Sequence, residues 1–442
     1  MFLTDRKLER RIAELKEHRY RDIINLNEFT VQEDTQGVVN PVLPEVFTGW
    51  DTLRVGDTWK GRDLFLWMHR EIQVPAEWKG KKIVGVFDFG NTGAGNNAGF
   101  ESMLYLNGKM YQGVDANHKE VFFDDTFCGT NMDVTFRLWS GLEGGGVPTP
   151  QEHRIARADL AWLDEEVDDF YYLASMVWET IKELNPVQHD LRKALDTACH
   201  CIDWAYPGSD TFYESVHEAD HLLNESIDSM DKKSSVNIRC VGHTHIDVAW
   251  LWRLKHTREK CSRSFTTVLR LMEQYPEYVF LQTQPQLYEY MKEEFPDIYK
   301  KIKERVAEGR WEADGAMWVE ADCNLTSGES LTRQILLGSK FIKDEFGKDV
   351  EYLWLPDVFG YSWALPQILK KAGINTFMTT KISWNQYNRM PHDTFKWKGI
   401  DVNLLFSYKL GRHVLNAGRG ASVGTILRAN TAEMMVPILA DL

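Results

Sequence analysis

Cysteine is scarce in this sequence. The chain has 442 residues but only six cysteines, too few for the disulfide framework of a small exported protein. We therefore expect free thiols and a reducing, cytoplasmic compartment. Cys199 and Cys201, with His200 between them, lack the spacing of a structural zinc site and have no second pair nearby. We therefore expect these residues to lie in the core or at the surface rather than to bind a metal.

Long apolar runs are also missing, and so is an excess of positive charge. No stretch reaches the roughly 20 apolar residues that span a membrane, and the opening MFLTDRKLERR lacks the apolar core of a signal peptide. The formal net charge of -14 argues against nucleic acid or an anionic membrane as a partner, because both bind basic surfaces. A neutral or cationic ligand is expected.

The hydrophobic pattern changes along the chain, and these changes suggest domains. Leu8, Ile12 and Leu15 have helical spacing, which predicts a helix over the first 30 or so residues. Between Trp59 and Trp139, short alternating segments are separated by turns rich in Gly and Asn, as in an antiparallel β-sandwich. The predicted domains are an N-terminal helical segment (1–45), a β-sandwich (46–150), a helical linker region (151–233) and an α/β domain (234–442).

The last of these domains alternates apolar strands with periodic helices. The predicted strands are 237–242, 278–283, 311–316, 350–355 and 375–379, and the helices between them are 257–274, 287–308, 329–346 and 366–372. Repeated strand–helix units imply a parallel sheet, either doubly wound or bent toward a barrel. In such folds the functional groups lie at the carboxyl ends of the strands.

One strand end carries side chains typical of metal ligands. The segment CVGHTHIDVAWLW starts at Cys240, and an extended backbone would place His243, His245 and Asp247 on one face. Imidazole and carboxylate groups are ligands for zinc, and also for cobalt or manganese. The sequence therefore predicts a site for a divalent metal.

Other strand ends add acids, an amide and indoles. Asp357 follows the apolar run 352–355, and its strand end would meet that of the histidines above one edge of the sheet. Acceptors for hydroxyl groups and flat apolar faces suit a polyhydroxylated ligand. The remaining candidates for contacts with such a ligand are Trp318, Glu320, Asp322, Trp384 and Asn385.

Several long motifs resemble the metal-dependent α-mannosidases of glycoside hydrolase family 38, most closely their bacterial and cytosolic branch. The motifs are FRLWSGLEGGG, GHTHIDVAWLWR, MWVEADCNLTSGESL, WLPDVFGYSWALPQIL and TKISWNQYN. By this resemblance, His245 and Asp247 match metal ligands, and Asp357 matches a residue that is both ligand and nucleophile. Trp250 and Phe359 match aromatic walls of the sugar site, and His243 matches a histidine that is not a ligand.

The resemblance implies a retaining α-mannosidase with an incomplete, barrel-like glycosidase domain at 234–442. In a retaining glycosidase a carboxylate attacks the anomeric carbon and a covalent glycosyl-enzyme forms. The implied cofactor is zinc, with cobalt or manganese as alternatives. The implied partner is an oligosaccharide with terminal α-mannosides. The resemblance is also compatible with a homo-oligomer of this chain.

The resemblance ends near Asp401, where we expect the chain to be truncated or altered. Residues 402–442 contain only Glu433 and Asp441 as acids, and neither matches the family's general acid. The family has a further histidine ligand later in its sequence, and this chain has no match for it. His413 lies beside Arg412, and we expect it to be a surface histidine.

Two alternatives stay open. The first is a catalytically impaired fragment that only binds metal or sugar. The second is a metal amidohydrolase or deacetylase, which would require further histidines at strand ends. Only His392 and His413 are available after the last motif, and neither follows a clear strand.

Overall fold

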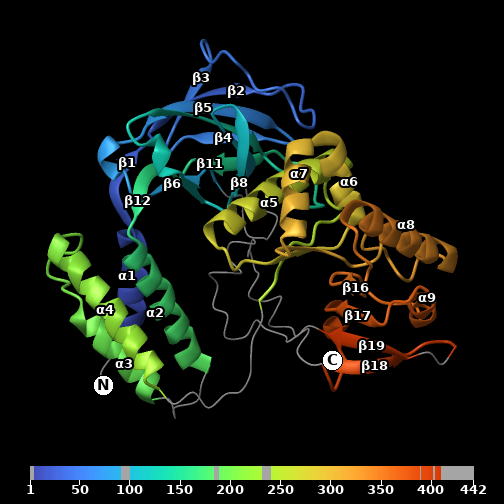
Figure 1. Ribbon diagram of the computed structural model, residues 1–442. Coiled ribbons are helices and arrows are strands. Elements are labelled where there is room, and N and C mark those ends of the chain that lie inside the picture. The colour runs from blue at the N-terminus through green and yellow to red at the C-terminus, as the bar shows by residue number, and fades with distance from the viewer. Residues whose placement is uncertain are drawn as a thin grey trace.

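The computed structural model describes residues 4–90, 100–183, 189–230, 240–388, 390–401 and 404–409. Antiparallel sheets form the upper part of the molecule in Figure 1, a group of helices lies below them at the left, and an α/β part lies at the lower right. Among the described residues, no helix combines the length and apolarity that crossing a bilayer requires.

Two antiparallel sheets form the β-sandwich. The smaller sheet has the order β1 (Tyr20–Asn25), β12 (Arg157–Leu163), β6 (Lys82–Asp88), β9 (Glu120–Phe123). The larger has the order β3 (Asp51–Arg54), β2 (Glu28–Glu33), β5 (Phe65–Gln73), β10 (Asn131–Trp139), β7 (Glu101–Leu106), β8 (Lys109–Asp115). β4 (Thr58–Gly61) and β11 (Gln151–Arg154) pair separately. Both sheets contribute to one core, in which Phe136 of β10 packs with Phe87 of β6. The expected antiparallel sandwich is confirmed.

The sandwich begins earlier and ends later in the chain than predicted. The predicted helix over the first 30 residues is wrong after His18, because β1 and β2 follow α1 (Thr4–His18) and pair with β12 and β5. The prediction missed the alternation of Phe29 and Val31, which are buried between more exposed neighbours. The predicted helical region (151–233) is likewise wrong at its start, where the chain forms β11 and β12. β12 is buried on both faces between β1 and β6, so its sequence shows no alternation.

Four helices share a separate apolar core. They are α1, α2 (Glu165–Glu183), α3 (His189–Cys201) and α4 (Asp210–Asp228). Arg19, which follows α1, joins this group to the sandwich, because its guanidinium pairs with Asp168 of α2 at 2.6 Å and with Glu120 of β9 at 3.0 Å. Cys199 is buried, Cys201 is half-buried and all six cysteines are free thiols, so the packing role predicted for the first of these residues is confirmed.

The α/β part has the predicted order of strands and helices. Its elements are β13 (Gly242–His243), α5 (Leu254–Gln274), β14 (Phe280–Gln282), α6 (Pro285–Glu294), α7 (Pro296–Ala307), β15 (Trp311–Ala313), α8 (Gly328–Phe346), β16 (Tyr352–Leu355), α9 (Leu365–Lys371), β17 (Thr376–Thr379), β18 (Thr394–Lys398) and β19 (Leu404–Lys409). The helix predicted at 287–308 is two helices, because Pro296 cannot continue the hydrogen bonding of α6 and starts α7. Part of the first predicted strand, 237–239, lies outside the described residues.

The parallel strands form two short sheets that meet at one bridge. Their orders are β13-β14-β15 and β16-β17-β19-β18, and only β18 runs antiparallel to its neighbour. A parallel bridge between Gly315 and Leu353 links the first sheet to the second. All strand ends that carry candidate site residues therefore point toward the same side. The division into four domains stays a prediction.

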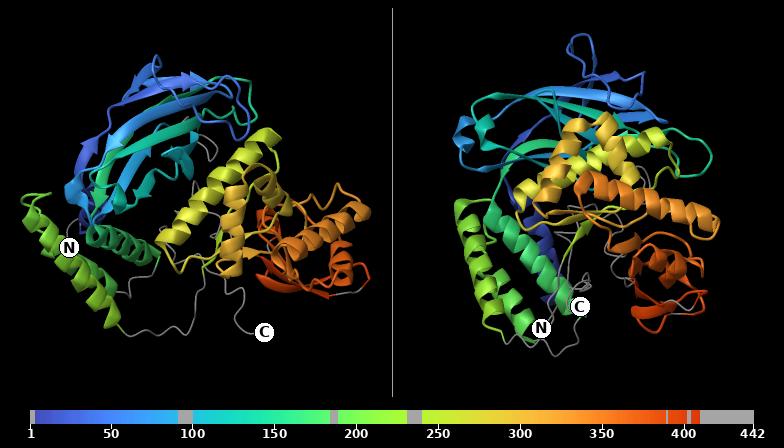
Figure 2. Two further views of the ribbon diagram at one scale, coloured as in Figure 1. Left: turned by 45° about the horizontal axis from the view of Figure 1, so that its top comes forward. Right: turned by 45° about the vertical axis from the view of Figure 1, so that its right-hand side comes forward.

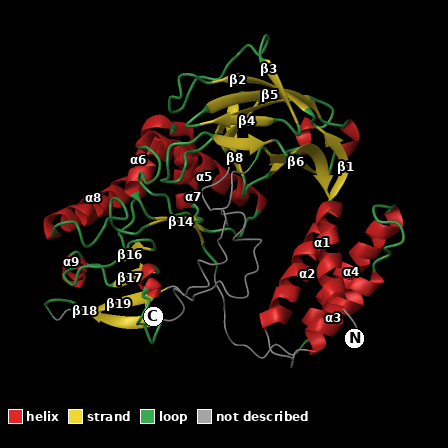
Figure 3. Ribbon diagram, turned by 180° about the vertical axis from the view of Figure 1, so that it is seen from behind, coloured by secondary structure: helices red, strands yellow, loops and turns green. Residues whose placement is uncertain are grey.

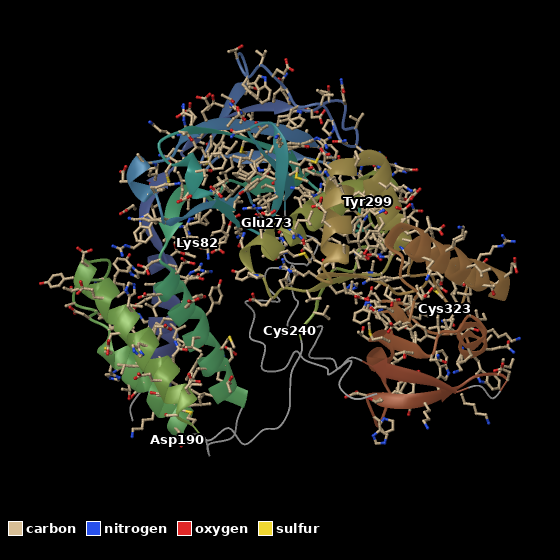
Figure 4. The ribbon with its side chains drawn as sticks, viewed as in Figure 1. Lys82, Asp190, Cys240, Glu273, Tyr299 and Cys323 are labelled. Carbon is tan, nitrogen blue, oxygen red and sulfur yellow. The ribbon has the colours of Figure 1, made fainter. Side chains whose placement is uncertain are left out.

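Helix α5 lies between the sandwich and the first parallel sheet (Figures 1 and 2). Its apolar residues, including Phe265, pack on Phe280 and Trp311 of that sheet. Its opposite face carries Glu259 and Arg263, which lie against the outer face of the larger sandwich sheet. In Figure 4 the label Glu273 marks the end of α5 below the sandwich, and Cys240 marks the segment that leads into β13.

Asp314 is a buried acid at the joint between the two parallel sheets. Its carboxylate accepts the N–H of Gly315 at 2.6 Å and that of Glu351 at 3.1 Å. Burial raises the pKa of Asp314 to about 7, although these hydrogen bonds act in the opposite direction. The folded state therefore holds the proton more tightly than the unfolded chain does. The free energy of unfolding falls as the pH rises from the ordinary pKa of an aspartate to about 7.

We expect Asp314→Asn to stabilise the protein increasingly between about pH 4 and about pH 8, by on the order of 3 kcal/mol at the upper end. The amide keeps an acceptor for the backbone but has no charge to desolvate. Thermal unfolding at both pH values measures this change. Asp349→Asn is the control, because that side chain is 85% exposed. Parallel stability profiles for the wild type and Asp314→Asn would contradict the prediction.

Candidate functional site

Side chains from four strand ends meet at one edge of the parallel sheets. His245 follows β13, Glu320 follows β15, Asp357 follows β16 and Lys381 follows β17. The view from behind in Figure 3 shows β14 near α7, and β16 and β17 between α8 and the strands β18 and β19. Because these strands are parallel, their carboxyl ends deliver polar side chains to a common place.

His245 is the centre of this group. Its Nε2 atom lies 3.3 Å from Asp247 Oδ1 and 3.7 Å from Asp357 Oδ2. Its Nδ1 atom lies 2.7 Å from Glu320 Oε2, an ion-pair contact without the alignment of a hydrogen bond. Three carboxylates thus surround one imidazole.

This crowding changes the proton affinities of the group. Burial alone would lower the pKa of His245, but the Glu320 and Asp247 carboxylates outweigh it and raise this pKa well above the ordinary value. Burial also raises the pKa of Glu320, whose side chain is only 4% exposed. Neither Glu320 oxygen has a hydrogen-bond partner within the described part of the chain. Both shifts favour the form with less negative charge, so positive charge is favoured at this place.

Lys381 provides an ammonium group at this edge. Its Nζ atom lies 2.8 Å from Asp357 Oδ1 and 4.8 Å from the centre of the Phe359 ring. One oxygen of Asp357 is thus held by Lys381, while the other faces His245. A carboxylate held in this way keeps a fixed orientation.

The turn that carries Asp357 is braced from several sides. The hydroxyl of Tyr361 lies 3.1 Å from the carbonyl of Leu355 and 2.9 Å from that of Val358. Thr380 donates to the carbonyl of Pro356 at 2.5 Å. Gly360 has a φ of 149°, and a Cβ there would lie 2.5 Å from the amide nitrogen of Asn324. Only glycine allows this close approach.

Buried glutamines hold the histidine segment. Gln284 donates to the carbonyl of Ile246 at 2.9 Å and accepts the N–H of Glu320 at 3.1 Å, so it ties two strand ends together. Gln282 donates to the carbonyl of Thr244 at 3.2 Å. Neither glutamine was predicted as part of the site, although Gln282 and Gln284 alternate at a strand end just as the site histidines do.

His243 has protein partners on both ring nitrogens. Its Nε2 atom accepts the indole N–H of Trp354 at 3.1 Å, and its Nδ1 atom donates to the carbonyl of Leu281 at 3.0 Å. Burial lowers the pKa of His243 to about 4, which keeps the ring neutral. These contacts agree with a structural role and leave no nitrogen free for a metal.

The other predicted site residues fall into two groups. Trp250 and Phe359 are 55% and 75% exposed, unlike the many buried aromatics of this chain. Trp318 donates to Gln286 at 3.0 Å, while Asp322 and Asn385 accept backbone N–H groups in their own turns. These contacts within the protein explain the positions of Trp318, Asp322 and Asn385 without a bound ligand. Their contacts with a sugar stay predictions. The side chain of Trp384 and all of His413 lie outside the described residues.

The donor set at His245 suits a divalent cation. An imidazole nitrogen and two carboxylates are ligands for zinc and for harder ions, and the close approach of the carboxylates favours a cation. In the described part of the chain, however, no three His, Cys, Asp or Glu side chains already have the arrangement of a metal cage. His245, Asp247 and Asp357 thus fit as donors without forming a complete site.

Residues 235–433 match the family described as the glycosyl hydrolases family 38 N-terminal domain. This part of the chain belongs to glycosyl hydrolase family 38. This match extends beyond Asp401, where the sequence analysis expected the resemblance to end. The predicted family is therefore confirmed.

Relatives with this domain are much longer than the present chain. It is 32% identical to α-mannosidase G of Dictyostelium discoideum over 77% of this chain and 32% of the relative. It is also 32% identical to human α-mannosidase 2C1, over 79% of this chain and 34% of the relative. Among solved structures, it is similar to an α-mannosidase from Enterococcus faecalis with a TM-score of 0.36 and 21% identity, covering 42% of this chain and 22% of the other. The chain thus spans about a third of the length of these curated relatives.

Glu320 gives a test of the site that does not depend on catalysis. We expect Glu320→Gln to lower the affinity for Zn²⁺ by about 10- to 100-fold, because the carboxylate behind His245 orients the ring and makes it more basic. Competition with a chromophoric chelator measures this affinity. Glu329→Gln on α8, where the side chain is 70% exposed, controls for the loss of charge. Equal affinities for both variants would contradict the role given to Glu320.

Proposed function

We propose that this chain carries the sugar-binding and nucleophilic half of a metal-dependent, retaining α-mannosidase. The observation that supports it is the placement of Asp357, held between Lys381 and His245 at the edge where the strand ends meet. Membership in glycosyl hydrolase family 38 supports the class of reaction. The proposed substrate is a terminal α-mannoside in an oligosaccharide, and the cytoplasm is the proposed compartment.

Asp357 acts as the nucleophile in this proposal. Its carboxylate oxygen forms a bond to the anomeric carbon while the bond from that carbon to the glycosidic oxygen breaks, which gives a glycosyl-aspartate. The leaving oxygen takes a proton from solvent. A water oxygen later bonds to the anomeric carbon while its bond to Asp357 breaks, and the proton of that water returns to solvent. The ammonium group of Lys381 holds one carboxylate oxygen of Asp357, which leaves the other oxygen to attack.

His245, Asp247 and Asp357 would hold the divalent cation, with zinc as first choice and cobalt or manganese as alternatives. When bound, such an ion supplies a Lewis acid that binds sugar hydroxyls and eases distortion of the ring. Glu320 keeps the His245 ring oriented toward the two aspartates.

The exposed rings of Trp250 and Phe359 provide the walls of the proposed sugar site. Flat apolar rings pack against the C–H face of a sugar, and exposed rings remain accessible to it. The further proposed sugar contacts are Trp318, Asp322, Trp384 and Asn385. In this proposal Glu320 acts from behind His245 rather than on the sugar, because its side chain is buried.

The two alternatives predict different outcomes. A fragment that only binds metal or sugar is favoured by the short span of the chain relative to its relatives, and it predicts binding without turnover. A deacetylase is disfavoured by the family match, and its required histidines are not found among the site residues described above.

Hydrolysis of an aryl α-mannoside tests the proposal directly. We expect turnover by the chain with Zn²⁺, Co²⁺ or Mn²⁺, and a loss of at least about 10³-fold in Asp357→Asn, because the amide cannot attack. Asp349→Asn, at an exposed position, should keep wild-type turnover. A chain that binds mannose but stays inert with every metal would support the binding fragment instead.

Lys381 gives a second kinetic test. We expect Lys381→Met to lower kcat by about 10²-fold with a smaller change in KM, because the ammonium holds Asp357 during attack. Lys381→Arg should restore part of the rate by returning the positive charge. Lys340→Met on α8, where the side chain is 72% exposed, is the matched control. Wild-type kcat in Lys381→Met would show that the ion pair is not needed.

A further inference from the structure

Asp63 connects the sandwich with the start of helix α5. It lies between β4 and β5, and its Oδ1 atom accepts the indole N–H of Trp139 at 2.9 Å and lies 2.6 Å from His256 Nε2. Its Oδ2 atom pairs with Arg253 and lies 3.7 Å from Lys255. One carboxylate of the sandwich thus contacts three residues at the N-terminal end of α5.

His256 passes this contact on to the segment that carries the site residues. The ring is fully buried and stacks on Trp139, with 4.5 Å between the ring centres. Its Nδ1 atom accepts the N–H of Arg253 at 3.0 Å. Since Nδ1 is the acceptor, Nε2 carries the hydrogen and donates to Asp63. The direction of both hydrogen bonds is therefore fixed by the contacts themselves.

The next residue of the helix holds the same segment at its other end. The hydroxyl of Thr257 donates to the carbonyl of Asp247 at 3.2 Å and accepts the N–H of Ala249 at 3.1 Å and the indole N–H of Trp252 at 3.0 Å. Ala249 has a φ of 69°, a left-handed conformation that costs an alanine energy. Such a backbone persists only where surrounding contacts enforce it. Thr257 supplies such a contact at Ala249 itself, and His256 holds Arg253 at the end of the same segment.

We propose that Asp63 is a positioning residue for the candidate site, and that the β-sandwich fixes the segment 247–253 through the chain Asp63, His256 and Arg253. This inference rests on the proposed function for its catalytic meaning, but its structural part does not. Asp247 and Trp250 lie on this segment, so its conformation sets where a metal ligand and a sugar wall stand. Asp63 touches neither group.

General packing between the sandwich and α5 would predict a different result. Near the other end of α5, Arg270 donates to the carbonyl of Phe122 on β9 at 2.9 Å and lies 4.3 Å from the Tyr111 ring centre. Arg270 belongs to the same interface, but within the described part of the chain its side chain makes no hydrogen bond or ion pair with residues 247–253. Arg270→Met therefore weakens the docking of α5 without touching the Asp63 chain, which makes it the matched control.

Amide hydrogen exchange on the full 442-residue chain tests the structural part. We expect Asp63→Asn to speed exchange at Ala249 and Arg253 by about tenfold or more, because loss of the anchor lets the segment open locally. Arg270→Met should leave both amides at wild-type rates. Unchanged exchange in a folded Asp63→Asn, or equal acceleration in both variants, would overturn the proposal.

Cobalt titration tests the link to the site. The visible absorption of bound Co²⁺ reports its ligand geometry, and we expect Asp63→Asn to change this spectrum and to weaken Co²⁺ binding by about tenfold. A wild-type spectrum and affinity in Asp63→Asn would overturn the link. If the wild-type chain itself neither binds Co²⁺ nor cleaves a mannoside, the proposed function fails, while the exchange result still decides the role of Asp63.

Trp139→Phe keeps the proposal testable if Asp63→Asn does not fold. This variant retains a ring against His256 but removes the N–H that holds Asp63. We expect a smaller acceleration, of about threefold, at the same two amides. Wild-type exchange at both amides in this folded variant would overturn the proposal.

Discussion

Helix α5 is buried on both of its sides, and the position of the site depends on this packing. Toward the sandwich the approach is so close that a Cβ on Gly113 of β8 would lie 2.8 Å from the carbonyl oxygen of Arg263. The same face buries an ion pair between Arg137 of β10 and Glu259 of α5. Charges buried in this way are costly when their partner is displaced, so the interface tolerates little sliding. The segment with His245 and Asp247 leads directly into this fixed helix.

The charge balance at the site follows from its location at strand ends. Separate strands bring Asp247, Glu320 and Asp357 toward His245, and Lys381 pairs with Asp357. Buried carboxylates without partners are unfavourable, and the raised pKa of Glu320 reflects this cost. A divalent cation between the aspartates and the imidazole would relieve the repulsion, which is why a metal suits the donor set better than a purely structural ion pair does.

The sequence predicted the α/β part well because its signals are local. Buried strand segments and periodic helices each carry their own pattern, and His245, Asp247 and Asp357 stand directly after such strands. Strands β1 and β12 were not predicted, because their state depends on pairing with partners far away in the chain. Pairing overrides local preference, and a strand buried on both faces has no alternation to reveal it.

The contacts that orient the site were harder to predict than the site residues themselves. Asp63 and His256 lie 193 positions apart, and neither stands at a strand end of the parallel sheets. Lys381 was visible at a strand end, but its pairing with Asp357 requires the register of β16 and β17. Glu320 was predicted to contact the ligand. Its burial behind His245 depends on how Gln284 holds its backbone. Residue type and sequence spacing identify the candidate ligands, whereas the orientation of their side chains depends on tertiary packing.

The two parallel sheets hold different halves of the site, so the joint between them sets the geometry of the donors. His245 comes from the first sheet and Asp357 from the second, and a bridge from Gly315 to Leu353 joins the two. A second bridge, from Cys323 to Tyr361, links the segment after Glu320 to the turn after Asp357; Figure 4 labels Cys323 between α8 and the second sheet. Since Glu320 lies against His245 and its segment is tied to the Asp357 turn, movement of either sheet would shift both donors relative to each other. The segment from β15 to α8 therefore helps to set the distance between the imidazole of His245 and the carboxylate of Asp357.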